Sequence, residues 1–119
     1  MNQEIIEIVK KNIYEDIVEL SDLDLQKKLW LNENNDTGLI SSYTEVMCRL
    51  FDDNCLDDFI DKEAHILGLT ITQISELDKL RKNLNNYKEK ETDGEIIEDP
   101  LWNEVVIQAQ KVLNIWELI

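Results

Sequence analysis

The sequence contains very little glycine and proline. Among its 119 residues there are three glycines and one proline. Antiparallel β domains need many tight turns, and such turns depend on glycine, proline and Asn-Gly pairs. Their scarcity therefore argues against a β fold and favours helices joined by few loops. Apolar residues make up 43% of the chain, and this length is enough for one hydrophobic core without metal or disulfide support.

Histidine and cysteine are also scarce, which limits the chemistry available. The single histidine, His65, does not supply the Glu-x-x-His pairs of carboxylate-bridged metal sites, and it is a poor basis for nucleophilic catalysis. Cys48 and Cys55 form no CxxC motif, so we expect them to be reduced and buried as small hydrophobic residues. Acid–base catalysis by two carboxylates stays open, because 26 acidic residues always provide pairs, but no pair stands out. We expect a non-enzymatic protein without metal or cofactor.

Long apolar runs are absent as well. No stretch of about 18 apolar residues is available to span a membrane. The first nine residues begin acidic and alternate charged with apolar residues, unlike the basic start and continuous apolar run of a signal peptide. We therefore expect the protein to be cytoplasmic.

Acidic residues are abundant: 26 against 12 basic residues give a formal net charge of −14. This charge disfavours binding to nucleic acid, whose phosphates attract lysine and arginine, and to anionic membrane surfaces. It favours a basic protein partner, or serves solubility alone. No feature indicates a small-molecule substrate.

Apolar spacing and helix-start motifs predict an all-α single domain covering residues 1–119, with five or six helices. We expect helices near 4–20, 21–30, 42–51, 56–68, 70–87 and 99–119, a loop at 32–38 and a polar linker at 91–99. Ser21 is the expected cap of the second helix, Ser42 with Glu45 and Thr70 with Gln73 form capping boxes, and Asp99-Pro100 begins the last helix.

The first and last helices show the clearest apolar faces. The first is expected to bury Ile6, Val9, Ile13, Ile17 and Leu20, in a stripe widened by Ile5 and Ile8. The last is expected to bury Leu101, Val105, Ala109, Val112, Trp116 and Ile119, with Trp102 as a further anchor. Trp30 ends a helix beside the polar loop, and packing in the core is its expected role.

A cluster of carboxylates in the middle of the chain is the candidate partner-binding site. Its members are Asp52, Asp53, Asp57, Asp58, Asp61 and Glu63, with Glu33 and Asp36 at the rim. Three of them, at 57, 58 and 61, share one helical face, where like charges repel by a few tenths of a kcal/mol. A sequence that keeps such repulsion holds this charge either for a basic partner or as an ordinary solvated face.

Two other constellations fit poorly. If Gly38 held the sixth position of an EF-hand loop, the twelfth would be Thr44 instead of the required glutamate, so we exclude this calcium motif. Between residues 71 and 94, five basic residues are balanced by five acidic ones. A solvated helix face explains that balance better than a nucleic-acid site does.

Several short segments resemble a known group of proteins. They are 29–32 (LWLN), 40–45 (ISSYTE), 50–53 (LFDD) and 99–102 (DPLW), the last followed by an amphipathic helix. Over about 29–118, the chain resembles immunity proteins of contact-dependent growth inhibition and related polymorphic toxin systems. The resemblance implies a small, cytoplasmic, non-catalytic protein that binds and blocks its cognate toxin domain. No functional residue is transferred from the family.

Charge and resemblance together predict an immunity protein that occludes a toxin domain with its acidic surface. A nuclease is the favoured toxin, because a nuclease cleft is basic and an acidic surface mimics its substrate's phosphates. The alternative is a cytosolic adaptor that binds another protein through an exposed apolar patch.

Overall fold

The apolar periodicity of the sequence forms helices close to where it predicts them. The computed structural model describes residues 3–116, and within this range every regular element is helical, in seven continuous segments. The elements are α1 (Gln3–Leu20), α2 (Leu23–Trp30), α3 (Tyr43–Cys48), η1 (Arg49–Asp53), α4 (Leu56–Asp58), η2 (Phe59–Glu63), α5 (Ala64–Ile66), α6 (Ile71–Asn86), α7 (Asp93–Glu98) and α8 (Pro100–Trp116). The predicted all-α class is confirmed.

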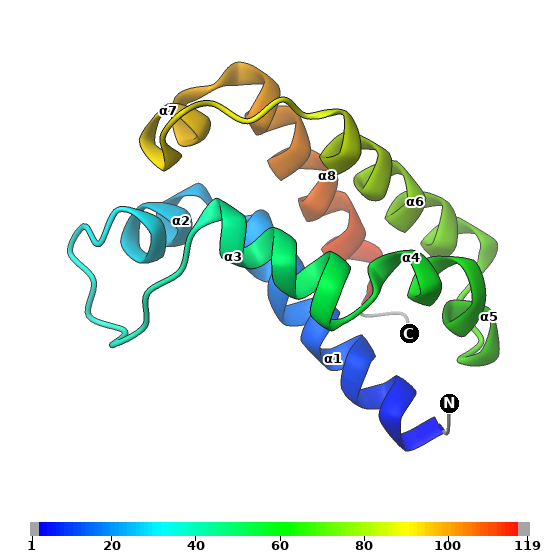
Figure 1. The fold of residues 1–119 in the computed structure, drawn as a ribbon. Coiled ribbons are helices and arrows are strands. Elements are labelled where there is room, and N and C mark those ends of the chain that lie inside the picture. The colour runs from blue at the N-terminus through cyan, green and yellow to red at the C-terminus, as the bar shows by residue number, and fades with distance from the viewer. Residues whose placement is uncertain (1–2, 117–119) are drawn as a thin grey trace.

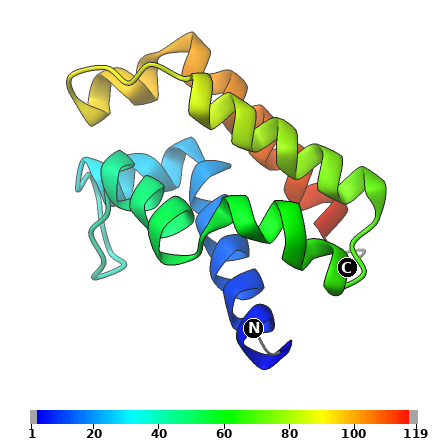
Figure 2. The same cartoon turned by 45° about the vertical axis from the view of Figure 1, so that its right-hand side comes forward.

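The two longest C-terminal helices form one side of the fold. In both views α6 runs alongside α8, while α1 crosses α8 and α2 lies near α7 (Figures 1 and 2). The hydrophobic core is one cluster drawn from all of these helices, and Trp102 and Phe59 are fully buried within it. Trp30 is buried in the same cluster, as expected.

Two of the seven segments contain wider, π-helical turns. In η1 the backbone N–H of Asn54 donates to Arg49 O over 2.9 Å, and in η2 the N–H of Ala64 donates to Phe59 O, both five residues back. Between these segments Cys55 has φ of +48°, a left-handed conformation that ends one helix and turns the chain into the next. The break expected between the helices at 42–51 and 56–68 is therefore confirmed, and it lies at Asn54 and Cys55.

The helix-start motifs are mostly confirmed. Thr70 with Gln73 forms a complete capping box on α6, whereas Ser42 caps α3 by accepting from the N–H of Glu45 without a return bond from the Glu45 side chain within residues 3–116. The capping box expected at Ser42 and Glu45 is therefore only half formed. The expected Ser21 cap is wrong. The Ser21 hydroxyl donates back to Val18 O at 2.8 Å, and the extended Asp22 caps α2 instead.

The expected start of the last helix is confirmed. The carboxylate of Asp99 accepts from the backbone N–H of Leu101 at 3.0 Å, and Pro100 is the first helical residue.

The segment expected to be a polar linker forms a short helix, α7. Thr92 caps it by accepting from the N–H of Glu95, and Ile96 and Ile97 are buried in the core. Acidic neighbours concealed this apolar pair in the sequence, so the predicted number of helices is too low.

Some residues expected in the core are exposed. Ile5 and Ile8 lie on the N-terminal turns of α1, which project beyond the rest of the fold (Figure 2). Leu101 is exposed because Trp102, about 100° further round the helix, takes the buried position at the start of α8. Ile119 lies outside the described residues.

Both cysteines are exposed thiols, which corrects their expected burial. Cys55 occupies the left-handed turn between η1 and α4, and Cys48 lies on the outer side of α3. The apolar positions around them, such as Val46 and Leu56, take the core sites instead.

No helix within residues 3–116 combines the length and the apolar character needed to cross a membrane.

Candidate functional site

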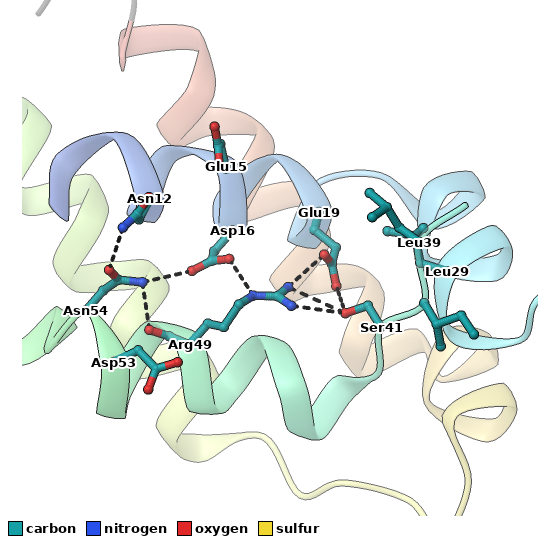
Figure 3. A pocket seen from close by; sticks show the side chains of 11 residues that line it. Asn12, Glu15, Asp16, Glu19, Leu29, Leu39, Ser41, Arg49, Asp53 and Asn54 are labelled. Atoms are coloured by element: carbon teal, nitrogen blue, oxygen red, sulfur yellow. Dashed lines mark hydrogen bonds and ion pairs between the residues drawn. The ribbon is translucent and has the colours of Figure 1, made fainter. Parts of the chain in front are cut away.

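A groove of about 520 Å³ lies between α1, the α3–η1 segment and the loop that joins α2 to α3. Figure 3 shows Asp16 and Glu19 of α1 and Ser41 of the loop pointing toward Arg49 of the α3–η1 segment. The lining residues are Asn12, Glu15, Asp16, Glu19, Leu29, Leu39, Ile40, Ser41, Arg49, Asp53 and Asn54.

Arg49 joins two buried carboxylates at the floor of the groove. Its Nε donates to Asp16 Oδ1 at 2.9 Å and its Nη2 donates to Glu19 Oε1 at 2.8 Å. Both carboxylates come from α1, three residues apart, and so face the same partner. The guanidinium already occupies the place between them, where a bound cation would otherwise sit.

Glu19 also fixes the two ends of the α2–α3 loop. Its Oε2 accepts from Trp30 Nε1 at 2.8 Å and from Ser41 Oγ at 2.7 Å. The backbone N–H of Ser41 donates to Leu29 O at 2.9 Å. One buried carboxylate therefore holds a helix end, a loop end and an arginine together.

Asn54 closes the other end of the network. Its Nδ2 donates to Arg49 O at 2.8 Å and lies 3.4 Å from Asp16 Oδ2, while its Oδ1 accepts from Asn12 Nδ2 at 3.3 Å. These bonds connect the break after η1 to α1, so that the chain reversal at Cys55 is fixed against the first helix.

Burial and charge act in opposite directions at the floor. Burial raises the pKa of Asp16 above its usual value, although the hydrogen bond and charge of Arg49 act to lower it. Burial alone would lower the pKa of Arg49, but Asp16 and Glu19 outweigh burial and raise it. Arg49 therefore stays charged, and it holds an ion pair that is costly to leave incomplete.

The rim of the groove differs from the floor, because the carboxylates at the rim have no bonding partner among residues 3–116. Glu15 and Asp53 are exposed, and within residues 3–116 neither carboxylate has a hydrogen bond or ion pair. They lie on opposite sides of the Arg49 network (Figure 3). Beside them Leu39 and Ile40 are 65% and 75% exposed. The rim thus combines unpaired negative charge with exposed apolar surface.

The α2–α3 loop has internal order that holds this apolar pair outward. Asn32, Asn34 and Gly38 adopt positive φ values of 55°, 47° and 76°. Asn35 Nδ2 donates to Leu39 O at 2.6 Å, and Asn35 Oδ1 accepts from the Thr37 N–H at 3.1 Å. The loop sequence at 32–38, NENNDTG, is rich in asparagine, aspartate and glycine, which tolerate such backbone conformations.

The structure divides the eight predicted site residues into two groups. Asp53 lines the groove, and Asp52 is exposed next to it. Glu33 and Asp36 are exposed on the loop that carries Leu39 and Ile40, and Asp36 lies 3.8 Å from Lys28 Nζ.

The remaining four lie on or near a second face, against α6. Arg81 Nη1 lies 3.2 Å from Asp57 and 3.0 Å from Asp61, and its Nη2 lies 2.6 Å from Asp78. Asp58 is exposed, whereas Glu63 is buried. The basic residues of α6 thus neutralise part of the predicted acidic cluster, because helix packing places Arg81 against it.

Sequence reasoning missed the floor and most of the rim: Glu15, Asp16, Glu19, Leu39, Ile40 and Arg49. Two signals were available. Asp16 and Glu19 stand directly before Ile17 and Leu20 of the apolar stripe, where a charge must find a partner. Arg49 is one of only two basic residues among nine acidic ones between 33 and 70.

The described part of the chain contains no group of three or more histidine, cysteine, aspartate or glutamate side chains arranged to hold a metal ion. We find no match of the chain to a protein-family model, a curated protein or a solved structure.

Proposed function

We propose that this protein is a non-catalytic inhibitor that binds a basic partner protein through its acidic surface. Its partner class is the toxin domain that an immunity protein neutralises, with a nuclease favoured, and it acts in the cytoplasm. The supporting observation is the exposed charge that the fold itself does not use. Asp52 and Asp53 are exposed, and within residues 3–116 neither has an ion-pair partner.

Unpaired surface carboxylates suit this role for a kinetic reason. A negative surface attracts a basic partner over distances near the Debye length and raises the association rate toward about 10⁸ M⁻¹s⁻¹ or more. An inhibitor of a toxin must bind before the toxin acts, so fast association is of direct value. A nuclease cleft supplies the complementary positive charge, since it binds phosphate.

The adaptor alternative is favoured by one observation. Several large apolar side chains are exposed, among them Leu39, Ile40, Ile66 and Ile71. An adaptor would bind through such residues and would depend little on salt.

Co-expression with the product of the neighbouring gene tests the proposal. We expect a stable complex that weakens as the salt concentration rises from 50 to 500 mM, and rescue of growth when that product is toxic. A complex insensitive to salt would favour the adaptor mode of binding. Absence of both complex and rescue would contradict the toxin-inhibitor proposal.

Charge reversal provides the residue-level test. Asp52→Lys with Asp53→Lys is expected to weaken the complex at least about tenfold, because it replaces attraction by repulsion at two positions. Unchanged affinity would show that the acidic surface does not form the interface. The thermal unfolding temperature of the variant serves as the folding control.

A further inference from the structure

Four hollows on the described surface are candidate binding sites. One is the groove around Arg49, and another is the hollow beside Ile71 and Arg81. The third is the exposed flank of α1 near Trp116. The fourth lies beside exposed Leu101 and carries Lys88 and Glu104, whose charges oppose each other, whereas the two unpaired charges of the groove are both negative. At the hollow beside Ile71, Arg81 already neutralises Asp61 and Asp78, and on the α1 flank Lys10 and Lys11 stand beside Glu7.

We propose that the groove, and not the face against α6, receives a basic segment of the partner protein. Arginine or lysine side chains of that segment pair with Glu15 and Asp53 at the two sides of the groove, and an apolar neighbour packs on Leu39 and Ile40. This inference rests on the proposed function, and it specifies where the partner binds and what the bound segment contains.

Charge complementarity identifies the occupant. Four carboxylates and one guanidinium line the groove, which gives a formal charge of −3. The two buried carboxylates are committed to Arg49, so the charge available to a partner is that of Glu15 and Asp53. A segment with basic residues compensates both without displacing the buried network.

Leu39 and Ile40 supply binding affinity that charge alone does not. Exposed ion pairs contribute little affinity, whereas apolar side chains that become desolvated at an interface act as anchors. Leu39 and Ile40 project from a loop already held by Asn35, and Ser41 is bonded to Glu19 directly after them. Little conformational entropy is therefore lost when a partner covers them.

The test uses a defined probe and does not require the natural partner. The ¹⁵N-labelled full chain is titrated with the peptide acetyl-Arg-Leu-Leu-Arg-amide and followed by amide chemical shifts. A peptide with citrulline in place of both arginines keeps the shape and loses the charge. We expect shifts concentrated at residues 12–16, 39–41 and 53–54, and about tenfold weaker binding of the citrulline peptide.

Matched double variants locate the interaction. Glu15→Gln with Asp53→Asn removes two charges at the groove, and Asp57→Asn with Asp58→Asn removes two elsewhere. We expect the first to bind the arginine peptide about tenfold more weakly and the second to bind nearly as the parent does. Since Glu15 and Asp53 make no ion pair with any residue in 3–116, the first variant should unfold at the parent's temperature.

Shifts centred on residues 57–61, equal binding of the citrulline peptide, or equal loss in both double variants would overturn the inference. If the groove variant bound the toxin domain as tightly as the parent protein does, the inference would be overturned while the proposed function stayed intact. A groove that binds the peptide in a protein that rescues no growth would support the groove and contradict the toxin-inhibitor proposal.

Discussion

Two arginines, Arg49 and Arg81, each bond to several carboxylates, and the two sets of carboxylates differ in how deeply they are buried. Arg49 bonds to Asp16 and Glu19, which are buried, whereas Arg81 bonds to Asp57 and Asp61, whose side chains are more than half exposed. The arginines themselves show the reverse order, with side chains 34% and 17% exposed. The burial of the carboxylates, more than that of the arginine, therefore decides how much each network contributes to stability.

Buried acceptors turn an ion pair into a structural requirement. If Arg49 is lost, two carboxylates remain in the fold without a positive partner, and an uncompensated buried charge is expensive. If Arg81 is lost, Asp57 and Asp61 turn to water at little cost. The groove therefore has a rigid floor, while the face against α6 is an adjustable surface.

The largest expected effect comes from removing the two arginines separately. Arg49→Ala should lower the free energy of unfolding by about 3–5 kcal/mol. Arg81→Ala should lower it by about 1 kcal/mol, the value of exposed pairs together with some lost packing of the stem. Chemical denaturation of both variants measures the difference.

A neutral residue of similar length sharpens this comparison. Arg49→Met leaves the packing of the stem and removes only the charge, so its loss should stay close to that of Arg49→Ala. Equal losses for the Arg49 and Arg81 variants would show that burial of the acceptors does not matter.

A smaller effect is expected at Glu19, which positions the apolar pair through Ser41. Glu19→Gln keeps the size of the side chain but replaces the carboxylate that accepts hydrogen bonds from Arg49, Trp30 and Ser41. The change should lower the free energy of unfolding by about 1.5–3 kcal/mol. Amide hydrogen exchange at residues 39–41 should become faster because the loop loses its attachment.

Glu45 provides the matched control for this prediction. Its carboxylate is exposed and lies 3.9 Å from Arg49, so Glu45→Gln should cost less than about 0.5 kcal/mol and leave loop exchange unchanged. Faster exchange in both variants would contradict the specific role of Glu19.

The smallest effect concerns the order in which carboxylates titrate. Burial raises the pKa of Asp16, whereas hydrogen bonds from Arg81 and Lys82 lower the pKa of Asp78. Carboxyl ¹³C shifts should therefore show Asp16 titrating above 3.8 and Asp78 below it. The opposite order would contradict the contrast between the two networks.

The two groups affect stability in opposite senses. Ionised Asp16 carries a cost that is fully present above its raised pKa and disappears as the pH falls to below 3.8. Asp78 contributes stability that is present above 3.8 and is lost as the pH falls through its lowered pKa. Asp16→Asn should therefore be less destabilising at pH 7 than near pH 4, relative to the parent protein, and denaturation at the two pH values measures this.

The helices were largely readable from the sequence because their signals are local. Apolar spacing placed α1, α6 and α8, and Ser42, Thr70 and Asp99 marked helix starts within three residues of the groups they bond. The helix α7 was missed, since its two buried isoleucines stand among acidic residues and gain their stability from the distant core.

The site was much less readable, because it depends on contacts between distant segments. Asp16 and Arg49 are 33 residues apart, and Asp57 and Arg81 are 24 apart. No periodicity reports which acidic residue meets which arginine. The cluster predicted at 52–63 is contiguous only in the sequence. In the fold Asp53 lines the groove, whereas Asp57 and Asp61 pair with Arg81 of α6.

Calorimetric titration of the proposed partner, a toxin domain, with the parent protein and the two double variants distinguishes the groove from the face against α6. We expect Glu15→Gln with Asp53→Asn to weaken binding about tenfold, and Asp57→Asn with Asp58→Asn to change it by less than about twofold. Equal weakening by both, or a loss confined to the second, would contradict the claim that the partner's basic segment binds in the groove.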